Sequence, residues 1–516
     1  MSKTFTVTFL PQKKKTEVPE GTTILAAEQM AGLEPDAPCG GNGKCGKCRV
    51  EILEGKKTGV VLACQTPVDS DMKIDTMLQE KVQRILAEGK TRSVPVDPGI
   101  TLTDPDSGRP YYLMAFDIGT TTVVGYLLDG KDGHEAGVAS MMNPQHQFGA
   151  DVISRANYVL ENGGEQMRKV IVDALNQLIG KACTDAGILR EDIIQISIVG
   201  NTCMHHLFLG ISPASLVHAP YTPAVSERLV LNAGDYGLDV QRKAELIMLP
   251  DIAGYVGADT CGCLLALRQD QKDEISLMID IGTNGEMVLG NRNRLVTCST
   301  AAGPAFEGAK IECGMRGAAG AVDHVKYENG KWDYTTVGNQ PAVGLCGSGL
   351  IDLVAGLLDA GMLDENGALS SGQEKQGVFM LVPLEQAGNE RGVYLTQKDI
   401  GEVQLAKAAI AAGIQMLMKR LGITEEEICS VYIAGAFGNY MDPVSAGKIG
   451  LLPAALVKKV KPVGNAAGEG AKIALVNERE MLEMDELVGK IDFVELAASG
   501  DFQDYFIDEL GFEANE

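Results

Sequence analysis

Four cysteines near the start of the chain have the spacing of a metal–thiolate site. Five residues separate Cys39 from Cys45, two separate Cys45 from Cys48, and fifteen separate Cys48 from Cys64. Four thiolates can hold the two irons of a [2Fe–2S] cluster, and glycines in this loop let backbone amides approach its sulfides. Zinc is the alternative, but structural zinc sites usually show paired CxxC or CxxH knuckles. One CxxC with a single cysteine on each side therefore favours a [2Fe–2S] cluster.

Two similar turns follow apolar segments farther along the chain. They are Asp117-Ile-Gly-Thr-Thr-Thr122 and Asp280-Ile-Gly-Thr-Asn-Gly-Glu286. In such a turn the backbone amides and hydroxyls can face phosphate oxygens, and the aspartate can hold Mg²⁺ directly or through water. Two turns on opposing halves predict a clamp for a triphosphate and its metal, with Asp117 and Asp280 as the catalytic carboxylates. The turn residues assigned to nucleotide binding are Gly119, Thr120, Thr121, Thr122, Gly282, Thr283, Asn284 and Gly285.

A third segment, Val431–Asn439, is an apolar strand that enters a glycine-rich turn, and we assign Gly435 and Gly438 to the nucleotide as well. The order of the three segments resembles the ASKHA superfamily, which contains acetate and sugar kinases, heat-shock chaperone ATPases and actin. The resemblance implies a bilobal ATPase whose third segment contacts adenosine. The chain has no GxxxxGK[ST] motif, which excludes a P-loop ATPase.

The elements that must position these residues divide the chain into four parts. Residues 4–10 alternate polar and apolar as a strand does, residues 13–19 can return as its partner, and a helix follows through Met30. We therefore predict a β-grasp, ferredoxin-like [2Fe–2S] domain over residues 1–75 and a proline-rich linker over 76–110. Apolar runs at 112–119, 196–200, 277–282 and 430–435, with a helix at 402–421, predict α/β halves over 111–275 and 276–516. The fold class is thus a multidomain α/β and α+β protein.

Composition excludes several classes of function. The formal net charge is −24, which disfavours nucleic acid as a partner. The apolar segments are interrupted by charge and glycine, so no membrane span is expected. The first residues lack the pattern of a signal peptide, and twelve cysteines without such a signal indicate thiols, not disulfides. We therefore expect a cytoplasmic protein.

Further stretches resemble the reductive activators of corrinoid proteins, which join a ferredoxin-like domain to this ATPase fold. They are Asn143–Arg155, Val199–Thr202, Gly303–Gly308 and Gly344–Asp352. The resemblance implies that the chain is an oxidoreductase that uses ATP and Mg²⁺ to deliver one electron from its cluster, converting inactive Co(II) to Co(I) for anaerobic methyl transfer. The implied partners are a corrinoid protein of a methyltransferase system and a low-potential electron donor such as a ferredoxin, and a homodimer is compatible with this function.

Two other functions fit the same residues. One is a nucleotide-gated electron-transfer adaptor whose ATPase fold only binds or assembles. The other is a small-molecule kinase that carries a regulatory iron–sulfur domain, which would need a carboxylate aimed at a substrate hydroxyl.

Overall fold

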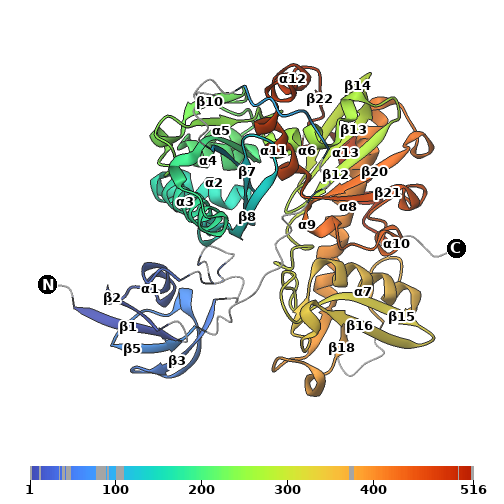
Figure 1. Cartoon of the computed structure of the whole chain (residues 1–516). Coiled ribbons are helices and arrows are strands. Elements are labelled where there is room, and N and C mark those ends of the chain that lie inside the picture. Colours follow the sequence, from blue (N-terminus) through green and yellow to red (C-terminus); the bar gives the residue numbers. More distant parts are fainter. Residues whose placement is uncertain are drawn as a thin grey trace.

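The computed structural model describes residues 3–10, 13–33, 35, 37, 41, 43, 48–76, 89, 92–99, 110–370, 377–497 and 499–512. The N-terminal domain is a five-stranded sheet in the order β2-β1-β5-β3-β4, with one helix against it (Figure 1). Its elements are β1 (Thr4–Leu10), β2 (Lys14–Pro19), α1 (Ile24–Met30), β3 (Arg49–Glu54), β4 (Gly59–Leu62) and β5 (Met72–Asp75). The strand, strand and helix predicted before the cysteine loop are confirmed, and Thr23 caps α1 by accepting a hydrogen bond from the Ala26 amide.

Two six-stranded sheets form the centres of the two halves that follow, and five strands of each share one topology, while the sixth strand is added at different edges. The first contains β6 (Tyr112–Ile118), β7 (Thr122–Asp129), β8 (Glu135–Met142), β9 (Ile193–Gly200), β10 (Leu229–Asn232) and β11 (Glu245–Met248). The second contains β12 (Ser276–Ile281), β13 (Gly285–Asn291), β14 (Arg294–Thr300), β20 (Ser430–Ala434), β21 (Val460–Gly464) and β22 (Asp492–Phe493). In each, the first strand pairs antiparallel with the next and parallel with a later one, so the two predicted turns occupy equivalent places. The predicted bilobal fold is confirmed.

Helices cover the outer faces of both sheets and also fill the space between them. The helices of the first half are α2 (Val152–Asn162), α3 (Glu165–Ala186), α4 (Thr202–Leu209), α5 (Ala214–Val217) and α6 (Ala258–Leu267). Those of the second half are α7 (Gly347–Asp359), α8 (Gln397–Leu421), α9 (Gly435–Gly438), α10 (Pro443–Lys448), α11 (Ala466–Val476), α12 (Glu478–Val488) and α13 (Gly500–Asp508). Smaller sheets complete this half with β15 (Ala321–Glu328), β16 (Lys331–Thr336), β17 (Gly344–Leu345), β18 (Val378–Val382) and β19 (Val393–Thr396).

Strand β6 shows why the molecule is layered. Successive side chains of a strand point to opposite faces, and here Met114 and Phe116 enter the core under α3, while Leu113 and Ala115 enter the core built on α6 and α11. The second core also contains Met278 of the other sheet, so α6 and α11 lie between the two halves. None of the helices in the described ranges has both the length and the apolarity needed to cross a bilayer.

Helices α6 and α11 approach each other so closely that glycine is required at their crossing. A Cβ on Gly470 would lie 1.9 Å from the Gly262 carbonyl oxygen, and one on Gly262 would lie 2.6 Å from the Ala467 carbonyl oxygen. Both distances are far below van der Waals contact, so any side chain here would force the helices apart. The two halves of the ATPase fold therefore meet through a tight helix pair.

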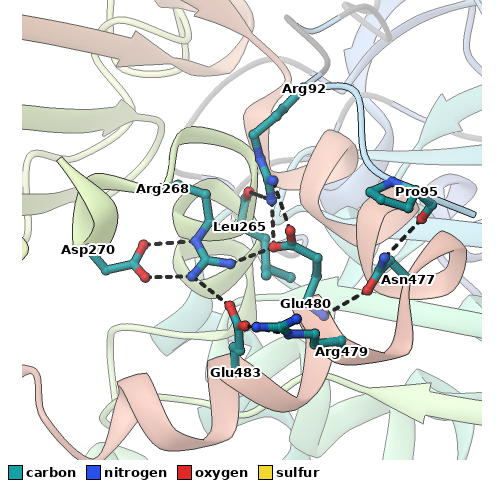
Figure 2. A network of polar contacts seen from close by, with 9 residues as sticks. All are labelled: Arg92, Pro95, Leu265, Arg268, Asp270, Asn477, Arg479, Glu480 and Glu483. Carbon is teal, nitrogen blue, oxygen red and sulfur yellow. Dashed lines mark hydrogen bonds and ion pairs between the residues drawn. The ribbon is translucent and has the colours of Figure 1, made fainter. Parts of the chain in front are cut away.

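Residues 92–99 of the predicted linker lie against this inter-lobe layer (Figure 2). Arg92 donates to Glu480 of α12 at 2.6 Å, and the Pro95 carbonyl accepts from Asn477 at 2.9 Å. Arg268, at the end of α6, is buried and pairs with Asp270 and Glu480 as well as with Glu483 at 2.9 Å. The Arg268 guanidinium thus joins the end of α6 to α12. Arg92 of the linker pairs with Glu480, one of the carboxylates that Arg268 also contacts.

Replacing Arg268 by Met is expected to lower the free energy of unfolding by roughly 3 kcal/mol, because it removes a buried cation that pairs with three partly buried carboxylates. Urea unfolding followed by circular dichroism measures this. Arg479→Met is the matched control, since Arg479 contacts the same Glu483 at 3.1 Å but its side chain is 88% exposed, and an exposed pair contributes ~1 kcal/mol or less. Equal effects of the two substitutions would show that the buried network does not stabilise the inter-lobe layer.

Candidate functional site

The described cysteines of the predicted cluster site lie side by side. Cys48 directly precedes β3 and Cys64 follows β4, and the Ala63 amide donates to the Cys48 carbonyl at 2.7 Å. Both cysteines are buried. Pairing of β3 with β4 therefore brings together two cysteines that have fifteen residues between them. Cys39 and Cys45 lie outside the described residues.

Two glycines of the cysteine loop lie close to Cys64 and Gln65, Gly41 against Cys64 and Gly43 against Gln65. Gly41 has a φ of +86° and Gly43 a φ of +72°, a region that favours glycine. A Cβ on Gly41 would lie 3.8 Å from the Cys64 Cβ, and the Gly41 carbonyl accepts a hydrogen bond from Gln65. The loop backbone thus lies close to a cysteine, as the packing of amides around cluster sulfides requires.

A cavity of about 280 Å³ lies between the two lobes and receives the ends of both central strands. Its lining includes Asp117 at the end of β6 and Asp280 at the end of β12, so the two turns face one space. The other predicted residues in the lining are Gly119, Thr120, Thr121, Thr122, Gly282, Thr283, Asn284 and Gly435. Gly285 and Gly438 lie outside it and have packing roles, because added Cβ atoms would meet Thr300 Oγ1 at 2.8 Å and Ile433 Cγ2 at 2.1 Å.

Carboxyl groups dominate the cavity. Burial, reinforced by Asp117, raises the pKa of Asp280 to about 7, and burial raises that of Asp117 to about 6 against the hydrogen bond from Asn465. Burial and Asp280 raise the pKa of Asp259 to about 7, and burial with Asp259 raises that of Glu286 well above its usual value. A cation beside these carboxyls would favour their ionised forms and so lower their pKa values.

The donor set fits Mg²⁺, which binds carboxylate oxygens together with substrate phosphates. Asp117 and Asp280 lie at the strand ends, with Asp259 and Glu286 beside them in the lining. The only basic side chain among the described lining residues is Arg316. A divalent ion held by these carboxylates would relieve their repulsion and neutralise an incoming triphosphate.

Residues far apart in the chain fix the two aspartates. Asn465, which caps α11, donates to Asp117 Oδ2 at 2.8 Å and to the Tyr126 hydroxyl at 3.0 Å. Gly435 has a φ of +84°, and a Cβ there would lie 2.7 Å from Asp280 Oδ1. The glycine-rich turn after β20 therefore needs glycine at this position for two reasons, its backbone conformation and its closeness to Asp280.

Sequence reasoning missed several residues of the cavity. Asp259 stands in the first turn of α6, and no repeated motif marks it. Asn201 follows β9 and donates to Thr120 Oγ1 at 3.0 Å. In the sequence, its segment is marked only by the family resemblance. Phe306 and Phe437 stack with ring centroids 5.2 Å apart at the wall of the cavity. These residues come from separate elements, so a local pattern could not have grouped them.

The segment after β8 supports the first turn from behind. The Asn143 side chain donates to the Gly119 carbonyl at 2.8 Å, and the buried guanidinium of Arg155 donates to the Thr120 carbonyl at 2.5 Å. In the same segment His146 contacts the Asn143 carbonyl at 2.9 Å and the Pro35 carbonyl of the N-terminal domain at 3.4 Å. One short segment thus touches both the nucleotide turn and the domain that carries the cysteines.

Comparison with protein families gives three matches in chain order. Residues 7–69 match the 2Fe-2S iron–sulfur cluster binding domain, residues 112–272 the RACo middle region, and residues 274–516 the C-terminal domain of RACo, the ASKHA domain. The first match supports a [2Fe–2S] cluster, and the third supports nucleotide binding.

Relatives with stated functions match over most of the chain. The corrinoid activation enzyme RamQ of Eubacterium limosum is 34% identical, over 94% of this chain and 95% of its own. The [Co(II) methylated amine-specific corrinoid protein] reductase of Methanosarcina barkeri is 26% identical, over 78% of this chain and 77% of its own. A solved structure of a reductive activator for a corrinoid, iron–sulfur protein is 32% identical, covers 99% of both chains and superposes with a TM-score of 0.72.

Proposed function

Because the chain belongs to the family of reductive activators of corrinoid proteins, we propose that it uses ATP to return the cobalt of a corrinoid protein from Co(II) to Co(I). The observation that carries this proposal is that one chain joins a cysteine site in a ferredoxin-like domain to a carboxylate-lined cavity between two ATPase lobes. Cys39, Cys45, Cys48 and Cys64 would hold the cluster, which supplies one-electron chemistry when bound.

In this proposal, electron transfer from the cluster to Co(II) is energetically unfavourable, and the ATPase lobes supply the free energy that it needs. Plant-type clusters have potentials near ~−400 mV, and each ~60 mV of uphill gap costs about 1.4 kcal/mol for one electron. Nucleotide can supply that free energy only if it binds two states of the complex differently. We therefore expect the lobes to close around Mg-ATP and to change how the corrinoid partner is held.

The contacts around Asn143 support such coupling. Asn143 holds the first phosphate turn through two hydrogen bonds, from its side chain to the Gly119 carbonyl and from its amide to the Thr121 carbonyl. Its own carbonyl contacts His146, which reaches Pro35 in the N-terminal domain. A shift of the turn on nucleotide binding would therefore change the contact with Pro35, which lies four residues before Cys39.

The same proposal includes the metal, the donor and the compartment. Asp117 and Asp280 would hold Mg²⁺, and the turn hydroxyls would orient the phosphates. A low-potential donor such as a ferredoxin would refill the cluster. Thiols that must stay reduced to hold iron fit the cytoplasm.

The proposal is tested by following cobalt. Purified protein is mixed under anaerobic conditions with a Co(II) corrinoid protein of a methyltransferase system, Ti(III) citrate and Mg-ATP, and absorption spectroscopy records Co(I). Co(I) should form with ATP and not with ADP, and the corrinoid protein should stimulate ATP hydrolysis. Sugar-stimulated ADP release without a change at cobalt would indicate a kinase instead, and nucleotide binding without turnover would indicate an adaptor.

A further inference from the structure

One carboxylate bridges the two phosphate turns. Glu307 accepts a hydrogen bond on Oε2 from the Thr121 hydroxyl at 2.8 Å, and one on Oε1 from the Thr283 hydroxyl at 3.1 Å. Thr121 belongs to the first lobe and Thr283 to the second. Glu307 therefore links the lobes at the point where the two turns face each other.

The backbone that carries Glu307 is held in place. The Glu307 amide donates to the Pro304 carbonyl at 3.1 Å, and a Cβ on Gly308, which has a φ of +74°, would lie 2.5 Å from the Met315 amide nitrogen. The neighbouring Phe306 is buried and stacks on Phe437. The loop after β14 thus fixes the base of the side chain, while the carboxylate itself can rotate about its own bonds.

The hydroxyls that Glu307 occupies are the donors that a phosphate would need. A carboxylate and a phosphate are both anionic acceptors, so they compete for the same two hydroxyls and repel each other. Building on the nucleotide site proposed above, we propose that Glu307 is the residue by which the cavity distinguishes ATP from ADP. Its carboxylate holds the place between the turns that the γ-phosphate takes, and it yields that place only to a nucleotide that has one.

In this role, the contact between the lobes through Glu307 depends on which nucleotide is bound. Without a γ-phosphate, the Thr121–Glu307–Thr283 bridge joins the turns through hydrogen bonds to one carboxylate. With ATP, the same hydroxyls turn to the phosphate. Charge at Glu307 should therefore weaken the binding of ATP while leaving that of ADP nearly unchanged.

Calorimetric titration of the full-length protein tests this with ADP and with the non-hydrolysable analogue AMPPNP, both with Mg²⁺. Glu307→Gln keeps the size of the side chain and removes its charge, and it should bind AMPPNP about tenfold more tightly, with ADP affinity within twofold of wild type. Glu307→Asp keeps the charge, and its ratio of AMPPNP to ADP affinity should stay within threefold of wild type. Glu328→Gln, at an exposed position at the end of β15, should leave the affinity for both nucleotides unchanged.

Other results would overturn the role. Equal shifts for the two nucleotides would make Glu307 a general structural residue, and weaker AMPPNP binding by Glu307→Gln would make it a ligand of the metal. Thermal unfolding followed by circular dichroism checks that each variant is folded. If the wild-type protein bound neither nucleotide, the proposed nucleotide site itself would fail, and this role with it.

Discussion

Asp280→Asn is expected to reduce the kcat for ATP hydrolysis by about 100-fold or more. The residue lies at the end of β12 in the cavity, facing Asp117 from the other lobe. Asparagine keeps the shape of the side chain but removes the negative charge that would hold Mg²⁺, the ion that would offset the charge developing on the phosphates. Loss of one such electrostatic group typically costs ~10²–10³ in rate. Steady-state phosphate release with saturating Mg-ATP measures the effect.

The same substitution should raise the stability of the nucleotide-free protein. Burial and Asp117 raise the pKa of Asp280, which means that the fold disfavours its ionised form at neutral pH. A neutral amide removes that penalty, so thermal unfolding should occur at a higher temperature while turnover falls. Asp273→Asn is the control, because Asp273 precedes the same strand but its side chain is 75% exposed. Normal turnover in Asp280→Asn would remove this residue from the catalytic site.

Cys48→Ser should abolish the visible absorbance of the cluster and the formation of Co(I). Cys48 is buried directly before β3, beside Cys64, which follows β4. Serine has nearly the same size, but iron–sulfur clusters are held by thiolates. Because the ATPase lobes have their own cores, ATP affinity should stay within about twofold of wild type. Iron and sulfide analysis, absorption spectra and ATP titration measure these quantities.

Cys183→Ser serves as the matched control for Cys48. Cys183 is also buried, but it lies on α3 in the core of the first lobe. Its replacement should leave the iron content and the spectrum unchanged. Zinc in place of iron in the purified wild-type protein, or full colour in Cys48→Ser, would contradict the assignment of this site.

Local sequence patterns predicted most of the elements that carry the site. The strand expected over residues 4–10 is β1, and the apolar runs near 112–119, 277–282 and 430–435 are β6, β12 and β20. The helix expected over 402–421 is the later part of α8, which begins earlier, at Gln397, where Thr396 and Asp399 form a capping box. These predictions succeeded because the residue periodicities of strands and helices depend on neighbouring residues. The boundaries proposed for the four domains stay predictions.

The linker and the inter-lobe layer were beyond such reasoning. Prolines in residues 93–110 indicate an absence of regular structure. That pattern does not predict the hydrogen bond between Arg92 and Glu480. The sequences of α6 and α11 are those of ordinary apolar helices. Only the structure shows that the two helices cross where Gly262 faces Gly470. Such contacts depend on how whole layers stack, which residue periodicity does not encode.

The sequence alone determined the chemistry that this protein can hold: four cysteines in one loop region, and two turns whose aspartate, glycine and hydroxyls suit a metal and phosphates. Those properties reside within a few consecutive residues, so spacing reveals them. Only the tertiary structure decided that the two turns share one cavity, that Asp259 and Asn465 join them, and that Glu307 spans both. Side chains that come from different strands and helices meet only when the two sheets pack around α6 and α11, because no local interaction specifies their distance.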